Sequence, residues 1–272
     1  MPLKAPFSAL RGWLIDMDGV IYRGNEPTPG AAAFIWALQE GGHRFMFLTN
    51  NATKTPHQYV EKLAEMDIHV GDENVFTSPL ATAAYLVRHL PPPRRLLVVG
   101  GDGIQRAVVE AGYQIVQRAE EAEVVVAGLD QHVTYEHLAE AALAIEAGCP
   151  WIGTNPDRNV PSERGRMPGA GALLAFLEAS TDRQPVIIGK PASGIYEQAI
   201  AILGTDLNET VMLGDRLETD ILGGHSAGLK TLCVLTGIAS GAAAETYDPR
   251  PDWIVPDLTH LLIDGGASGR PS

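Results

Sequence analysis

The chain has 272 residues, of which 45% are hydrophobic, and its 33 acidic and 20 basic residues give a formal net charge of −13. This length can bury a full core without disulfide staples, and the acidic balance argues against a nucleic-acid surface. The two cysteines, Cys149 and Cys233, lack the spacing of a zinc site or a disulfide framework. Because no long apolar run is present, we expect a cytoplasmic protein with no membrane partner.

Strand-like and helix-like segments alternate along nearly the whole chain. The first strand lies at Leu14 and Ile15, and a helix over Gly30–Glu40 follows it. Thr55 and Pro56 have the pattern of a helix N-terminus. Because the strands are apolar throughout, the pattern predicts an α/β fold with a doubly wound, mostly parallel, Rossmann-like sheet. The other strands are expected at Phe45–Leu48, Val75–Thr77, Leu96–Val99, Val124–Ala127, Trp151–Ile152, Val186–Ile188, Val211–Leu213 and Thr231–Leu235.

Two breaks in composition divide the chain into two predicted domains. Residues 91–95 (PPPRR) can neither continue a helix nor pair inside a sheet, and residues 180–185 (STDRQP) are polar. We therefore expect a discontinuous core of residues 1–91 and 185–272, with an α/β domain of residues 92–184 inserted into it. The last residues, 264–272, have nothing to bury and are expected to be disordered.

Polar or charged residues follow four of the predicted strands. If these strands are parallel, the four segments meet at one edge of the sheet, where open α/β sheets bind ligands. Together they offer carboxylates, hydroxyl and amide donors and a lysine, which suit phosphoryl transfer assisted by a divalent cation. A carboxylate can also attack phosphorus itself. The four segments are Asp16–Gly19, Thr49–Asn51, Gly189–Pro191 and Gly214–Asp220.

In this order, the four segments resemble motifs one to four of the haloacid dehalogenase superfamily of phosphohydrolases. Thirty residues (19–48) separate the first two segments, too few for an inserted domain, whereas 138 residues (52–189) separate the second and third. The finer resemblance is to subfamily IIA, which contains nucleotide, pyridoxal-phosphate and 4-nitrophenyl-phosphate phosphatases. It implies a large α/β cap at residues 92–184, with a segment over Gly153–Asp157 that reaches the substrate.

The resemblance implies a role for each acid. Asp16 would attack phosphorus and form an aspartyl-phosphate, and Asp18 would protonate the leaving oxygen and later deprotonate water. Mg²⁺ would be held by Asp16, by the main-chain carbonyl of Asp18 and by Asp215. Asp220 would orient the metal's waters or the lysine of the third motif.

The resemblance also implies the residues that bind substrate. Thr49 and the main-chain amides of Asn50 and Asn51 would hold the transferring phosphoryl group, and Lys190 would neutralise its charge. The expected substrate is a small phosphorylated metabolite, such as a nucleoside monophosphate, a sugar phosphate, phosphoglycolate or 4-nitrophenyl phosphate. A homodimer stays open.

Features of the sequence disfavour three other functions. Gly224–Gly228 (GHSAG) matches the pattern of a serine esterase, but that motif needs a strand before it and a helix after it, and the predicted order here is the reverse. A phosphomutase usually carries its cap after the first motif. A regulator without activity is disfavoured because every residue that the chemistry needs is present. Val160 stands before Pro161 where the pyridoxal-phosphatase branch would have a histidine, which argues against that substrate.

Overall fold

The computed structural model describes residues 1–162 and 165–263 and divides into two compact units. Unit 1 contains residues 1–48, 60–75 and 196–272, and unit 2 contains residues 49–59 and 76–195. The tail predicted to be disordered, 264–272, lies outside the described residues. In the part of the chain that is described, no helix is long and apolar enough to cross a membrane.

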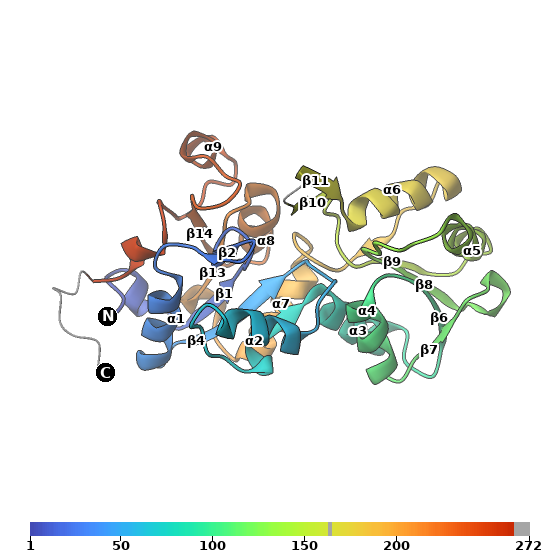
Figure 1. Ribbon diagram of the computed structural model, residues 1–272, viewed down its shortest axis with the longest axis horizontal. Coiled ribbons are helices and arrows are strands. Elements are labelled where there is room, and N and C mark those ends of the chain that lie inside the picture. The colour runs from blue at the N-terminus through green and yellow to red at the C-terminus, as the bar shows by residue number, and fades with distance from the viewer. Residues whose placement is uncertain (163–164, 264–272) are drawn as a thin grey trace. The chain divides into compact units, whose positions relative to one another are not determined.

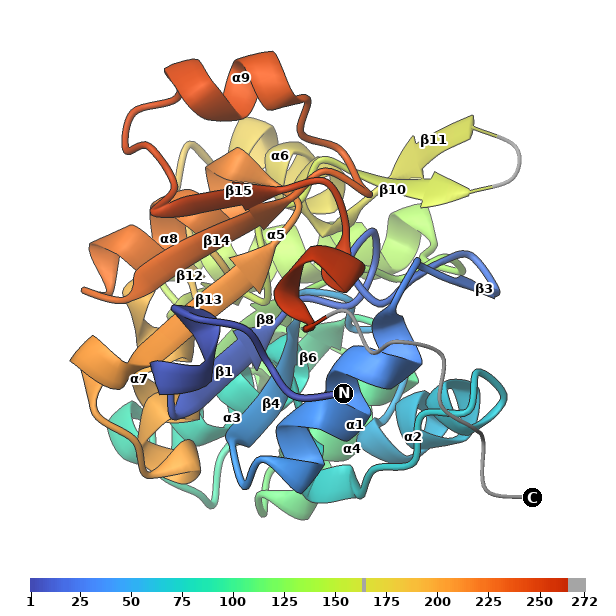
Figure 2. The ribbon, with the colours of Figure 1, turned by 90° about the vertical axis from the view of Figure 1, so that its left-hand side faces the viewer.

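A six-stranded sheet in the order β15-β14-β13-β1-β4-β5 forms the centre of the first unit (Figure 2). The pairings that join β15, β14, β13, β1 and β4 are all parallel. Helix α1 lies on one face of this sheet, and α7 and α8 lie on the other, as expected when the crossovers run outward in both directions from β1 (Figure 2). The strands are β1 (Gly12–Ile15), β4 (Arg44–Thr49), β5 (Val75–Thr77), β13 (Thr210–Gly214), β14 (Lys230–Val234) and β15 (Trp253–Val255).

The central strands of this sheet are buried on both faces. Every residue of β1 is buried, and Trp13 packs edge-on against Phe34 of α1 with ring centroids 5.2 Å apart. This burial explains why these strands are apolar throughout rather than alternating. The other elements of this part of the chain are α1 (Ala31–Glu40), α2 (Pro56–Ala64), α7 (Ser193–Leu203), α8 (Leu222–Ser226), α9 (Gly241–Thr246) and the short strands β2 (Tyr22–Arg23) and β3 (Glu26–Pro27).

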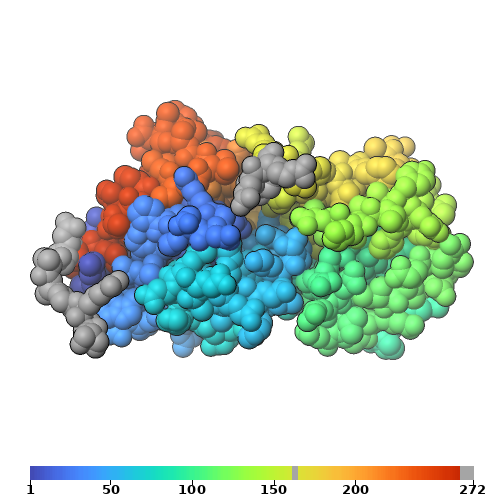
Figure 3. Space-filling view, viewed as in Figure 1, coloured from blue at the N-terminus to red at the C-terminus, as the bar shows by residue number. Residues whose placement is uncertain are grey.

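The second unit is built on a five-stranded parallel sheet in the order β12-β9-β8-β6-β7. Helices α5 and α6 lie on one face of it and α3 and α4 on the other (Figure 1). Helix α5 also contributes to the surface seen in Figure 3, in yellow-green. The elements are α3 (Ser78–His89), β6 (Arg95–Val99), α4 (Asp102–Glu110), β7 (Gln114–Val116), β8 (Val124–Ala127), α5 (Tyr135–Glu146), β9 (Trp151–Gly153), the antiparallel hairpin β10 (Asn159–Ser162) and β11 (Gly165–Pro168), α6 (Ala170–Thr181) and β12 (Val186–Ile187).

The structure confirms the predicted α/β class and most predicted strands, with one difference that affects the site. The strand at Val186 was expected to share a sheet with the other three motif strands, but β12 pairs with β9 at the edge of the second sheet. The strands that were not predicted are short: β2, β3, β7, β10, β11 and β15. Each has only two to four residues, too few for a periodic pattern to emerge. The limits 92–184 of the inserted domain stay a prediction.

Candidate active site

Three aspartates of unit 1 gather at the carboxyl ends of β1 and β13. Asp16 follows Ile15 and Asp215 follows Gly214, and the two strands are parallel neighbours in which Ile15 is paired with Leu213. The main-chain N–H of Asp16 donates to the carbonyl of Leu213 at 2.9 Å, which continues the pairing by one residue. Carboxylate oxygens of Asp16, Asp215 and Asp220 all lie within 4.8 Å of one another. Three carboxylates this close suit a divalent cation.

The Asp215 side chain is held in place by the loop that follows β14. Its Oδ2 accepts a hydrogen bond from the Ile238 N–H at 2.7 Å, and its main-chain carbonyl accepts one from the Ala239 N–H at 2.9 Å. The residue is only 2% exposed. A Cβ at Gly237 would overlap the Asp215 carboxylate, so the loop can approach this closely only with glycine there.

Asp18 and Gly19 form the tight turn that the sequence predicted after β1. Gly19 has φ +88°, a left-handed conformation that favours glycine, and its N–H donates to the Tyr22 carbonyl at 2.7 Å. A Cβ at Gly19 would come within 2.5 Å of the Asp215 Oδ2. The Thr236 hydroxyl donates to the Gly19 carbonyl at 2.6 Å and fixes the turn from the other side. Within the described residues, the Asp18 carboxylate is not part of the three-acid group.

Asp220 lies in the first turn of a helical segment that opens as a π-helix, Leu217–Ile221. Its Oδ2 accepts from the Arg216 N–H at 3.1 Å, so it satisfies a donor at the start of the helix while it belongs to the acid group. These charges reach Cys233 on β14. Burial raises the pKa of its thiol to about 12, and the charges of Asp215 and then Asp220 add to that effect.

The predicted phosphoryl-binding residues belong to the second unit. Thr49 ends β4, and its Oγ1 accepts from the Asn51 N–H at 3.1 Å. The Asn51 Oδ1 in turn accepts from the Thr53 N–H at 3.0 Å. These hydrogen bonds shape the loop after β4 so that successive main-chain amides are held in a defined arrangement.

Asn50 connects this loop to Lys190. Its Oδ1 accepts from the Lys190 N–H at 2.8 Å, and its Nδ2 donates to the Lys190 carbonyl at 2.9 Å. A Cβ at Gly189 would come within 2.6 Å of the Asn50 Oδ1, so this contact needs the glycine. The main chain of Lys190 is therefore hydrogen-bonded to the loop after β4 by the side-chain amide of Asn50. The strand that precedes Lys190 does not belong to the same sheet as β4.

The GHSAG segment does not have the geometry of an esterase. Ser226 is the last residue of α8, its hydroxyl donates to the Leu222 carbonyl at 2.7 Å, and β14 follows the helix. A nucleophile elbow needs a strand before the serine and a helix after it. Gly228 ends the helix with φ +79°, as predicted.

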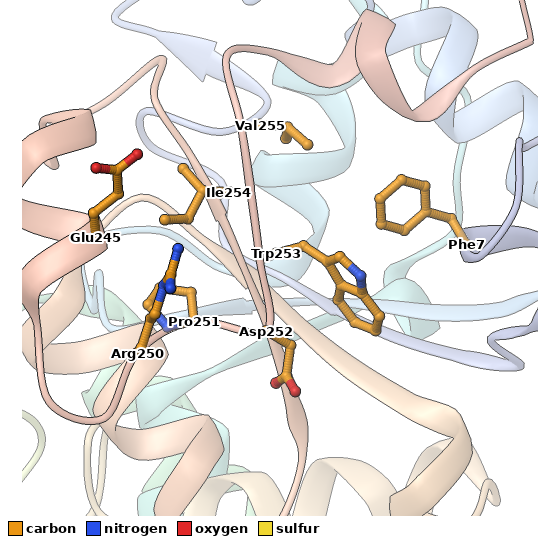
Figure 4. Close-up of a pocket in the computed structure, with 8 residues that line it drawn as sticks. All are labelled: Phe7, Glu245, Arg250, Pro251, Asp252, Trp253, Ile254 and Val255. Atoms are coloured by element: carbon orange, nitrogen blue, oxygen red, sulfur yellow. The ribbon is translucent and has the colours of Figure 1, made fainter.

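A pocket beside the edge strand β15 is separate from the acid group. It contains none of the predicted site residues, and its charged side chains come from α9 and from the segment before β15 (Figure 4). It is lined by Phe7, Glu245, Arg250, Pro251, Asp252, Trp253, Ile254 and Val255.

Sequence reasoning missed the loop after β14, although a signal for it was present. Thr236 and Gly237 follow an apolar strand, which is the pattern that singled out the other four segments. It also did not anticipate how Asn155 and Asp157 are used. Asn155 donates to the Asn50 carbonyl at 2.8 Å, and Asp157 accepts from the Asn50 side chain at 3.0 Å.

Family models match most of the region that carries these residues. The model of haloacid dehalogenase-like hydrolases matches residues 13–114, and a second model of HAD-hydrolase-like proteins matches residues 187–261. The 5'-nucleotidase YutF of Bacillus subtilis is 41% identical over 252 residues, which cover 93% of this chain and 97% of the relative. The chain belongs to the haloacid dehalogenase-like hydrolases.

A second relative and a solved structure match over a similar extent of the chain. The acid sugar phosphatase of Staphylococcus aureus is 40% identical over 254 residues, covering 93% of this chain and 97% of the relative. A crystal structure of a glycerol phosphate phosphatase from Mycobacterium tuberculosis, in complex with magnesium, superposes with a TM-score of 0.89 at 37% identity and covers 95% of this chain and 78% of that one. Within its family the chain is a phosphatase of the subfamily IIA type, an enzyme that hydrolyses phosphoric monoesters.

Proposed function

We propose that this protein is a Mg²⁺-dependent phosphatase that hydrolyses small phosphorylated metabolites through an aspartyl-phosphate on Asp16. The observation that carries the proposal is the group of three carboxylates within 4.8 Å at the ends of β1 and β13. In a chain of this family, such a group suits a divalent cation beside a nucleophilic carboxylate.

The donor set fits Mg²⁺. Asp16, Asp215 and the main-chain carbonyl of Asp18 would hold the ion. Asp220 would orient the water ligands of the ion without binding the ion itself. When bound, Mg²⁺ would neutralise negative charge on the phosphoryl group and on Asp16. The Gly19 turn and the Ile238 N–H support this arrangement because both constrain the position of the Asp215 carboxylate.

Two aspartates would carry the covalent and proton-transfer steps. The Asp16 carboxylate attacks phosphorus, and the bond from phosphorus to the ester oxygen breaks. Asp18 gives its proton to that oxygen, and the alcohol leaves. Asp18, now a carboxylate, removes a proton from water, which attacks phosphorus and releases Asp16 and inorganic phosphate. The position of Asp18 outside the three-acid group agrees with a role in proton transfer rather than side-chain ligation.

The residues around Asn50 would bind the phosphoryl oxygens. The Thr49 hydroxyl and the main-chain amides of Asn50 and Asn51 would donate to them, and the Lys190 ammonium would neutralise charge that develops in the transition state. The paired hydrogen bonds between Asn50 and Lys190 support this assignment because they join the two phosphate-binding segments into one structural element.

The substrate class is a small phosphoric monoester. The relatives are named for nucleotides, acid sugar phosphates and glycerol phosphate, and these define the candidates for this chain. We propose that residues 92–184 form the cap that selects among them. A cytoplasmic location stays a prediction, and whether the chain forms a homodimer stays open.

The test is phosphate release from a panel of phosphorylated metabolites and 4-nitrophenyl phosphate, with and without Mg²⁺. We expect turnover that requires Mg²⁺, that a chelator abolishes, and that Asp16→Asn removes. Activity that survives chelation, or that survives Asp16→Asn, would contradict the proposal. Trapping of a phosphorylated Asp16 in acid-quenched reactions tests the intermediate directly.

A further inference from the structure

Asp157 is half-buried in the loop after β9 and belongs to a polar network centred on the buried Asn50. Its Oδ2 accepts from the Asn50 Nδ2 at 3.0 Å. The Asp157 N–H donates to the Asn155 Oδ1 at 3.2 Å, and the Asn155 Nδ2 donates to the Asn50 carbonyl at 2.8 Å. That carbonyl also accepts from the Ser78 hydroxyl at 2.9 Å. The loop after β9 therefore contacts Asn50 at both its side chain and its main chain.

The three partners of the Asn50 side chain determine which way its amide points. The Oδ1 accepts a hydrogen bond from the Lys190 N–H. One Nδ2 proton is donated to the Lys190 carbonyl, and the other is donated to the Asp157 carboxylate. If the amide turned over, its oxygen would face the Asp157 carboxylate and the Lys190 carbonyl, two acceptors that cannot donate to it. Asp157 supplies the charged partner, and hydrogen bonds to charged groups are stronger than neutral ones.

The main chain around Asp157 is also fixed. Its carbonyl accepts from the Gly171 N–H at 2.8 Å, and the Arg158 carbonyl accepts from the Gly169 N–H at 2.9 Å. These bonds close the base of the β10–β11 hairpin onto the start of α6. These bonds constrain the main chain at Asp157, from which its carboxylate accepts a hydrogen bond from Asn50.

We propose that Asp157 is a positioning residue for the phosphatase reaction. It fixes the orientation of the Asn50 amide, and the amide in turn fixes the main chain at Lys190 and the loop that follows Thr49. The inference rests on the proposed function, because it matters for turnover only if Lys190 and this loop bind the phosphoryl group. The hydrogen bond between Asp157 and Asn50 also connects the β10–β11 hairpin, which follows Asp157, to the proposed phosphate-binding residues.

The experiment compares Asp157→Ala, Asp157→Asn, Asn50→Ala and the double variant. Losing a charge-assisted hydrogen bond predicts a fall in kcat on the order of tenfold for Asp157→Ala, with a smaller change in KM. Asp157→Asn should recover part of this loss, because its Oδ1 still accepts from Asn50 although the negative charge is gone. The double variant should be no slower than Asn50→Ala alone, since Asp157 acts through Asn50. Glu146→Gln, which removes an exposed carboxylate at the end of α5, is the matched control and should leave kcat unchanged.

Amide hydrogen exchange provides a readout that does not depend on activity. The Lys190 N–H should exchange faster in Asp157→Ala than in the wild type, while amides of β8 keep their protection. Independent, additive losses in the double variant, or unchanged exchange at Lys190, would overturn the inference. A wild-type protein without Mg²⁺-dependent turnover would instead refute the proposed function, so the two failures are distinguishable.

Discussion

Asp215→Asn should make the metal-free protein more stable while it removes the metal site. Asp215 is 2% exposed, and its carboxylate lies within 4.8 Å of two others. At an effective dielectric constant of about 20, each such pair of charges repels by about 3.5 kcal/mol. The neutral amide removes this repulsion but weakens the bond from the Ile238 N–H by about 1–2 kcal/mol, so relief of one such pair leaves a net gain of about 2 kcal/mol.

Thermal unfolding in a chelator and in Mg²⁺ measures both effects. In the chelator, a gain of about 2 kcal/mol should raise the Tm of the variant by about 4–8 °C for a chain of this size. In Mg²⁺ at about 100 times its Kd, the wild type should gain about 2.7 kcal/mol, whereas the variant should gain nothing. Glu65→Gln, an exposed acid of unit 1, is the control and should change neither curve. A lower Tm for Asp215→Asn in the chelator, or a Tm that still rises with Mg²⁺, would refute the reasoning.

Two further substitutions and one chemical modification test other features of the chain. Asp18→Asn should keep Mg²⁺-dependent stabilisation, because its carboxylate lies outside the acid group, yet lose turnover; normal kcat would show that Asp18 carries no proton. Ser226→Ala should leave kcat intact, since its hydroxyl is engaged at the end of α8, and a loss of activity would revive the esterase hypothesis. Because burial, with Asp215 and Asp220 adding to it, raises the pKa of Cys233 to about 12, its thiol should stay protonated and unreactive at pH 9. A thiol reagent should then modify at most Cys149 in the native chain and both cysteines after unfolding, and rapid modification of native Cys233 would contradict this.

Much of the first sheet could be predicted because its strands are buried on both faces. Continuous apolar runs such as Trp13–Ile15 and Val211–Leu213 are typical of parallel strands that are covered on both faces. The residues that follow such strands lie at the edge of the sheet where ligands bind. The sequence therefore predicts that Asp16 and Asp215 meet at one edge of the sheet if these strands are parallel, and the structure makes β1 and β13 parallel neighbours. The turn at Gly19 was predicted as well, because an Asp-Gly pair directly after a strand is typical of a turn.

Lys190 could not be placed by the same reasoning. Its preceding strand, β12, belongs to the second sheet, and strand composition does not say which sheet a strand joins. Its position depends on the side chain of Asn50, 140 residues away in sequence, and on Asp157 behind that side chain. A contact of this kind leaves no periodic pattern, because it is made by single residues in loops.

The sequence by itself determined the α/β class, the order of the four motifs and the carboxylates that could hold a metal, because apolar periodicity and turn residues act locally. Only the tertiary structure decided that Asp220 joins Asp16 and Asp215, that the loop after β14 fixes Asp215, and that Asn50 connects Lys190 to the end of β4. These facts depend on distances of a few ångströms between segments far apart in the chain, and such distances are set by packing rather than by local preference.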